Sequence, residues 1–387
     1  MDGASMTGDE LYGIVEAYAA FGDHHTGTDA DRNTADWLCQ RLSAIGASSV
    51  EQETFEFDRY VVSVAELRTT GGEVIPSVPV FYSFAGSLET SSLATVSVTE
   101  RVEGPAKGLD RWLDAIDGPA AVLALTGDEL EGRRRHPIQC NRVPVLRADG
   151  PAAVIVAADQ LADLDGGASL RFQAAIEPGR AVNVVAAFGH GDEQPSQPAV
   201  TITTPLSGWT PAAGERGTGL AVALALSADL AADHPVRFVA CSGHELDHIG
   251  LQHHVERTGL VDGRAVIHIG ASVGAVEWVN GQAELGRERL VLTTATDDAL
   301  LDRLRVSVAR GNWSLVEPET WAGEGANWRK AGANVLSFIG SSSLFHTAGD
   351  AAAAATTPEL MTTACQVVID STRMFLGAHG GDQPIRG

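Results

Sequence analysis

Two hydrophobic periods alternate along the chain and divide it into helical and extended stretches. Apolar residues keep helical spacing within residues 8–46, which predicts two helices separated by a polar loop at Gly22–Asp29. Apolar and polar residues alternate from Val50 to Arg68, which predicts β-strands. From Ala181 onward, short apolar runs alternate with helical stretches, and this order predicts a mostly parallel sheet with helices on both faces.

The C-terminal half contains the clearest of these elements. We expect strands at Val182–Ala187, Ala199–Thr203, Val236–Cys241, Ala265–Ile269, Leu290–Thr294 and Val335–Ile339. We expect helices at Thr218–Ala231, His244–Thr258, Asp298–Arg310 and Pro358–Leu376, with the run Ala351–Ala355 as a loop or the start of a helix.

Residues 70–178 have a different pattern, in which Gly, Pro and Asp separate short apolar runs. Expected strands are Ala120–Leu125, Val143–Leu146 and Ala152–Ala157, with a helix at Leu109–Ile116. We therefore divide the chain into an α/β domain of residues 1–69 and 179–387 and an inserted small β-rich domain of residues 70–178. The insert is interpreted as a lid, a substrate platform or packing.

Composition excludes several classes of function. The net charge of −23 argues against a nucleic-acid-binding surface. The excess of Arg over Lys fits a high-salt cytoplasm or a GC-rich coding sequence. The four cysteines form no CxxC pair, so free thiols are expected. No apolar run is long enough to span a membrane and the first residues do not have the pattern of a secretion signal, so we expect a cytoplasmic protein.

Candidate chemistry follows the strand ends, where open α/β sheets bind ligands. The strand Val236–Cys241 is followed directly by Ser-Gly and then by His244, Glu245 and His248. Imidazole and carboxylate groups at such a turn bind divalent metals or transfer protons. Two further stretches of this kind are Ala213–Gly219, with Glu215, and Leu344–Asp350, with His346.

These motifs resemble the M28 family of zinc exopeptidases, which are aminopeptidases with glutaminyl cyclases among their relatives. The resemblance is stronger after residue 181. Glu215-Arg216-Gly217-Thr218-Gly219-Leu220-Ala221 aligns with the family pattern Asp-Asn-x-Ser-Gly-Val-Ala, and His244-Glu245 aligns with its Glu-Glu pair. Phe345-His346 to Asp350 aligns with its closing Tyr-His-x-x-x-Asp. The stretch around Ile116–Gly118 and Ala152–Val156 is similar to a protease-associated domain.

The resemblance implies an aminopeptidase-like α/β/α fold with a mixed central sheet and one zinc ion held by Glu215, Glu245 and His346. The family's second zinc loses its ligands here, because Thr204 and Gly270 or Ala271 stand at their places. His244 replaces the family's general base, and it serves here as the base, as an additional ligand or as neither. Residues expected to bind the substrate are Arg216, Glu324, Trp209 and Trp321; Arg216 could instead pair with Glu215 or Glu324 and abolish metal binding.

A second interpretation of the same turn is the zinc motif H-E-x-x-H, with His244 and His248 as ligands and Glu245 as base. We favour a divergent M28-like hydrolase of peptide or amide bonds with a small-molecule or short-peptide substrate. The alternatives are lyase or cyclase chemistry on a small metabolite, and a metal-free binding protein. We expect His24 and His25 to lie on the surface.

Overall fold

The computed structural model describes residues 6–126, 135–189, 200–259, 265–286, 289–317 and 321–379. Its α-helices are α1 (Gly8–Ala19), α2 (Asp29–Ala44), α3 (Asp110–Asp114), α4 (Thr218–Leu230), α5 (Ile249–Thr258), α6 (Asp298–Ala309), α7 (Gly325–Lys330), α8 (Ala352–Ala355) and α9 (Pro358–His379). A 3-10 helix, η2 (Ala158–Leu164), and a π-helical turn, η3 (Ala213–Gly217), complete the helical elements of these residues.

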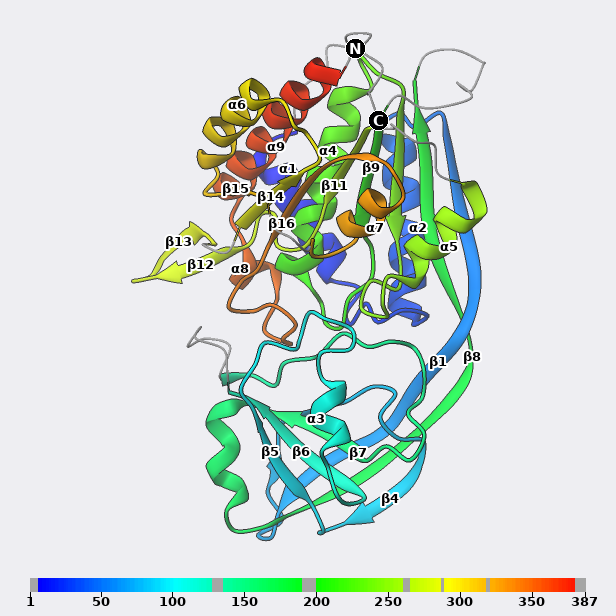
Figure 1. The fold of residues 1–387 in the computed structure, drawn as a ribbon, viewed down its shortest axis with the longest axis vertical. Coiled ribbons are helices and arrows are strands. Elements are labelled where there is room, and N and C mark those ends of the chain that lie inside the picture. The colour runs from blue at the N-terminus through cyan, green and yellow to red at the C-terminus, as the bar shows by residue number, and fades with distance from the viewer. Residues whose placement is uncertain are drawn as a thin grey trace.

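A large mixed sheet forms the centre of the molecule (Figure 1). Its strands follow the order β15 (Ser314–Val316), β14 (Arg289–Thr293), β16 (Asn334–Gly340), β11 (Ala265–Ile269), β9 (Val200–Pro205), β10 (Val236–Cys241), β8 (Ala168–Phe188), β1 (Ser49–Thr69) and β2 (Val74–Ile75), with β4 (Gly86–Thr90) paired to β8. Strands β16, β11, β9 and β10 are mutually parallel, so their carboxyl ends meet at one edge of the sheet.

Helices cover both faces of this sheet, because successive strand residues point to opposite sides. In β10, Phe238 and Ala240 pack into the core that contains α1, α4 and α9, whereas Val239 and Cys241 pack against α5 and α7. These buried alternating positions produce the three-layer α/β/α architecture that the sequence predicted.

A second, four-stranded sheet lies beside the carboxyl ends of the central strands (Figure 1). Its strands are, in order, β3 (Ser77–Pro79), β7 (Ala152–Val156), β6 (Ala120–Leu125) and β5 (Ala94–Val98). Strands β1 and β8 pair over almost their whole length and run from the central sheet to the second one. The predicted boundary at residue 178 falls inside β8, and the division into domains stays a prediction.

Several elements differ from the sequence prediction. The stretch Val143–Leu146 is not a strand, although its residues are apolar, and Val145 is largely exposed. The helix expected from His244 begins only at Ile249, because the turn before it has left-handed residues. Ala352–Ala355 forms a short helix, and the predicted first residue of β9, Ala199, lies outside the described residues. Strands β12 (Val276–Val279) and β13 (Gln282–Leu285) form a hairpin that the sequence analysis did not find.

No helix in the described ranges combines the length and the apolar character that crossing a membrane requires.

Candidate functional site

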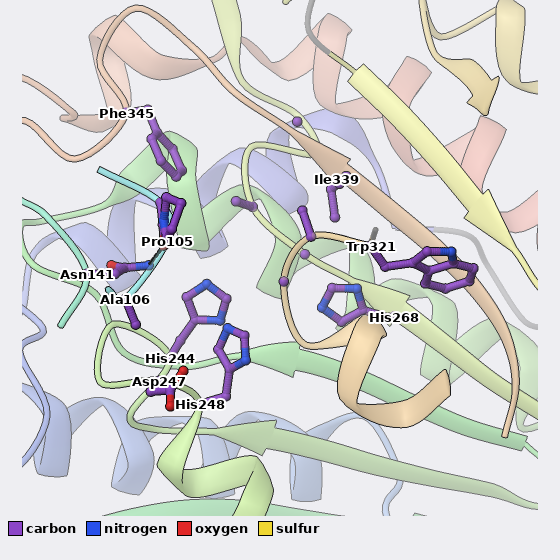
Figure 2. A pocket seen from close by; sticks show the side chains of 16 residues that line it. Pro105, Ala106, Asn141, His244, Asp247, His248, His268, Trp321, Ile339 and Phe345 are labelled. Carbon is purple, nitrogen blue, oxygen red and sulfur yellow. Dashed lines mark hydrogen bonds between the residues drawn. The ribbon is translucent and has the colours of Figure 1, made fainter. Parts of the chain in front are cut away.

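A cavity of about 500 Å³ opens at the carboxyl ends of the central strands (Figure 2). Its wall includes three histidines, which we call the pocket histidines: His244 after β10, His248 before α5, and His268 within β11. Trp321 and Phe345 contribute aromatic surface, and Asn141 comes from the part of the chain that carries the second sheet. Figure 2 shows His244 and His248 next to one another, with His268 further along the wall beside Trp321.

The turn that carries His244 depends on two glycines. Gly243 has a φ of +80°, and a Cβ atom there would lie 2.4 Å from Ile249 Cγ1. A Cβ atom on Gly250 would lie 1.9 Å from the carbonyl oxygen of Ser242. Asp247 and His248 both adopt the left-handed conformation, which is uncommon for residues with a side chain. This tight geometry turns the side chains of His244, Asp247 and His248 toward the cavity.

His244 is held by a buried carboxyl group. Its Nδ1 lies 3.1 Å from Glu324 Oε1, and Glu324 has no exposed surface. Burial raises the pKa of Glu324 to about 8, against the opposing effect of the Arg216 charge. Burial, followed by the charge of Arg216, lowers the pKa of His244 well below its ordinary value. The imidazole is therefore neutral at pH 7, and its Nε2 has no partner among the described residues.

The other two pocket histidines are anchored in the same way. His248 Nδ1 lies 3.0 Å from Asn327 Oδ1, and His268 Nδ1 lies 2.8 Å from Ser337 Oγ. Burial lowers the pKa of His268 to about 3, and its buried Nε2 has no hydrogen-bond partner within the ranges that the structure covers. All three rings are thus fixed at Nδ1 with no described partner at Nε2.

Glu245 points away from the cavity into a second cluster. Its Oε1 accepts hydrogen bonds from the backbone and hydroxyl of Thr26 at 2.8 and 2.6 Å, and its Oε2 lies 2.6 Å from Ser207 Oγ. The same two hydroxyl oxygens accept from the backbone N–H of Gly243. Both carboxylate oxygens of Glu245 are therefore satisfied by the protein itself.

Glu215 is paired with its neighbour in sequence. Arg216 Nη2 lies 2.7 Å from Glu215 Oε1, and His346 Nε2 lies 3.2 Å from the same oxygen. Arg216 Nε donates to the carbonyl of Ser207 at 2.8 Å, and all these side chains are buried. Burial would raise the pKa of Glu215, but the charge of Arg216 and the contact with His346 lower it to about 2. We call Glu215, Arg216, Glu245 and His346 the buried ion cluster.

The contacts of the buried ion cluster do not fit the predicted zinc site. A catalytic zinc takes three protein ligands and a water. Here the oxygens of Glu245 accept from Thr26 and Ser207, and Glu215 already faces a guanidinium cation. Across the described residues, no group of three His, Cys, Asp or Glu side chains is placed to hold a metal ion. Of the alternatives that the sequence left open for Arg216, pairing with Glu215 is the one present.

The H-E-x-x-H interpretation also requires a helix that places both histidines on one face. His248 instead has a φ of +62° and precedes α5, and His244 lies in the turn before it. The Glu245 carboxylate is in the other cluster. The three residues of the motif therefore do not converge on one point.

The remaining predicted substrate-binding residues separate into two groups. Trp321 lines the cavity, and Glu324 lies directly behind His244. Arg216 is buried against Glu215, and Trp209 packs against His25 and Phe81, so neither is part of the cavity wall. The expectation that His24 and His25 are exposed was wrong. Both are buried, because their rings stack on Tyr18 and Trp209, respectively.

The segment Gln139–Arg142 joins the part of the chain that carries the second sheet to the buried ion cluster. Gln139 exchanges two hydrogen bonds with His346: its N–H donates to the His346 carbonyl, and its carbonyl accepts from His346 Nδ1 at 2.9 Å. Arg142 N donates to the Glu245 carbonyl, and Asn141 Oδ1 accepts from Trp209 Nε1. No sequence pattern in this segment signalled these contacts.

No protein-family model matches the chain, and no curated protein matches it in sequence. Solved structures match it over almost its whole length. A zinc aminopeptidase from Bacillus subtilis, BSAP, is 16% identical, with 95% of this chain and 94% of that chain covered and a TM-score of 0.69. A Peptidase M28 precursor from Shewanella amazonensis SB2B is 17% identical, with 97% and 95% covered and a TM-score of 0.70. An aminopeptidase from Aneurinibacillus sp. strain AM-1 is 15% identical, with 95% and 93% covered and a TM-score of 0.59. The chain therefore has the fold of these peptidases.

Proposed function

We propose that this chain hydrolyses a small amide or peptide substrate in the cavity of the pocket histidines, with His244 as the general base. The observation that carries the proposal is the His244–Glu324 pair: His244 lines the cavity, and a fully buried carboxyl group holds its Nδ1. A general base needs a basic atom within reach of the substrate and a partner that orients it. The likeness to aminopeptidases supports amide bonds as the substrate class.

The protonation state of Glu324 decides whether His244 Nε2 faces the cavity with a lone pair or with a hydrogen. When Glu324 is ionised, it accepts from Nδ1–H, and Nε2 then has a lone pair that takes a proton from the attacking water and passes it to the leaving amine as the C–N bond breaks. When Glu324 is protonated, it donates to Nδ1, and Nε2 carries a hydrogen instead. His244 can therefore act as a base only when Glu324 is ionised. Since burial raises the pKa of Glu324 to about 8, we expect turnover to increase as the pH rises through about 8.

Other cavity residues have supporting roles in this scheme. His268 Nε2 is positioned to hydrogen-bond a substrate oxygen, because its Nδ1 is already paired with Ser337. Trp321 and Phe345 provide apolar surface for the side chain of the substrate. The buried ion cluster lies behind this wall and fixes the turn that carries His244. No step of the scheme runs through zinc, because the contacts of Glu215 and Glu245 do not fit it.

A second candidate function is ligand binding without catalysis. It is favoured by the internal pairing of Glu215 with Arg216, which neutralises the carboxylate that the family pattern assigns to a metal. Both candidates place the ligand in the same cavity, and they differ in whether a bond is broken.

The test is release of p-nitroaniline from a panel of aminoacyl p-nitroanilides at low and high salt. We expect turnover that a chelator leaves unchanged and that His244→Gln abolishes. Absence of turnover across the panel, together with saturable binding of dipeptides, would favour the binding protein. Turnover that the chelator abolishes and zinc restores would refute the metal-independent scheme.

A further inference from the structure

His248 lines the same cavity as His244, and a residue of the short helix α7 hydrogen-bonds its ring. Glu324, the residue just before α7, anchors His244, and Asn327 in the first turn of α7 anchors His248. The two imidazole centres are 4.7 Å apart. The sequence analysis gave His248 a role only in the H-E-x-x-H interpretation, which the geometry does not support.

The chemistry of the two anchors differs. The Oδ1 atom of Asn327 accepts hydrogen bonds and never donates, so His248 Nδ1 must carry the hydrogen in this contact. A neutral His248 then has its lone pair on Nε2, and this atom has no hydrogen-bond partner among the described residues. Unlike Glu324, Asn327 does not ionise, so this tautomer is independent of the protonation that switches His244. The left-handed backbone of His248 is the conformation that directs the ring to this position.

We propose that His248 is a second hydrogen-bond acceptor of the cavity, acting beside His244 on the same ligand group, and that Asn327 is the positioning residue that fixes its tautomer. The inference rests on the proposed function only for the location of the ligand. Two neighbouring acceptors match a group with two donor hydrogens. In the hydrolysis scheme that group is the attacking water: one O–H proton passes to Nε2 of His244, while the other O–H donates a hydrogen bond to Nε2 of His248.

The tautomer is testable without a substrate, by long-range ¹H–¹⁵N NMR of histidine-labelled protein. We expect His248 to carry hydrogen on Nδ1 and a bare Nε2 in the wild type at neutral pH. Asn327→Leu removes the acceptor and should shift His248 toward the Nε2–H tautomer, with the His244 signals less affected. His248→Gln assigns the His248 signals, and His253→Gln, which removes a histidine of helix α5 that is stacked on Phe55 outside the cavity wall, serves as control. A wild-type His248 that is charged or hydrogenated on Nε2 would overturn the inference, even if the Asn327 variant fails to fold.

Turnover of the best p-nitroanilide provides the second readout. We expect His248→Gln to lower kcat by about 10-fold, the loss of one well-placed hydrogen bond to the water, with a smaller change in KM and an unchanged melting temperature. The rise of kcat with pH should stay, because it belongs to Glu324. Unchanged kcat in this variant would refute the role of His248 and leave the proposed function standing. If the wild type itself shows no turnover, the proposed function fails, and the tautomer measurement alone decides the inference.

Discussion

His244 and Glu245 are neighbours in sequence but belong to opposite kinds of environment. His244 faces a cavity, and among the described residues only one of its ring nitrogens has a partner. Glu245 is fully buried, and both of its carboxylate oxygens are hydrogen-bonded by Thr26 and Ser207. Buried charges are tolerated when the protein satisfies them completely, whereas a group that performs chemistry must keep one atom free for the ligand. By this criterion His244 is placed to act on a ligand, and Glu245 supports the turn that carries it.

The largest effect is expected from removing the base. His244→Gln keeps a side chain of similar reach but cannot accept a proton at neutral pH. We expect kcat on the p-nitroanilide panel to fall by about 10²–10⁴-fold, the usual contribution of a general base. His253→Gln serves as the matched control. Equal losses of kcat in the two variants would contradict a specific role for His244 in catalysis.

A large loss of stability is expected from breaking the buried ion pair. Arg216→Met leaves Glu215 charged and uncompensated, which should lower the free energy of unfolding by about 3–5 kcal/mol. The double variant Glu215→Gln with Arg216→Met removes both charges and should recover most of this loss. Denaturation in urea measures both values. A double variant as unstable as Arg216→Met alone would contradict the pairing of these two residues.

A moderate loss is expected from the hydrogen bonds to Glu245. Thr26→Val keeps the shape of the side chain and removes the hydroxyl that bonds both Glu245 and the backbone of Gly243. We expect destabilisation of about 1–3 kcal/mol, because a buried carboxylate loses a donor. Thr95→Val, at an exposed position of β5, is the comparison for a residue outside the cluster. Similar losses of unfolding free energy in both variants would mean that the hydrogen bonds to Glu245 do not stabilise the protein more than an exposed threonine does.

The last expected effect is a change in the pH dependence of stability. Burial raises the pKa of Glu324 from 4.5 to about 8, so the folded state holds this proton more tightly than the unfolded state. The contribution of Glu324 to stability is therefore largest below pH 4.5 and decreases as the pH rises toward 8. In Glu324→Gln this decrease should be absent, so the stability difference between variant and wild type should change across this window. Parallel curves would indicate an ordinary pKa for Glu324.

The fold was accessible from the sequence because its elements are long and periodic. Strand Val236–Cys241 and strand Ala265–Ile269 occur at the predicted residues, since short, mainly apolar runs of this kind are typical of buried strands. The candidate site was accessible only in part. The position of His244 at a strand end was visible, but its partner Glu324 lies eighty residues away along the chain. The contacts of Thr26, Ser207 and Asn327 depend on tertiary packing, and no local pattern marks such residues.

The zinc prediction depends on more than alignment. Glu215, Glu245 and His346 stand at the ligand positions of the family pattern, but a ligand also needs free lone pairs. Those of Glu245 are occupied by hydroxyl and backbone donors, and Arg216 supplies positive charge beside Glu215. Such competition between internal partners and a metal is a property of side-chain packing, which the order of residues does not reveal.

The metal content of the protein tests the central claim most directly. Protein purified without chelator, and the same protein after incubation with zinc and removal of the excess, would be analysed by mass spectrometry of its metals, with Glu215→Gln beside it. We expect far less than one zinc per chain in every sample and no increase in melting temperature on adding zinc. About one zinc per chain that stabilises the wild type and is lost in Glu215→Gln would contradict the account, because the buried ion cluster would then be a metal site.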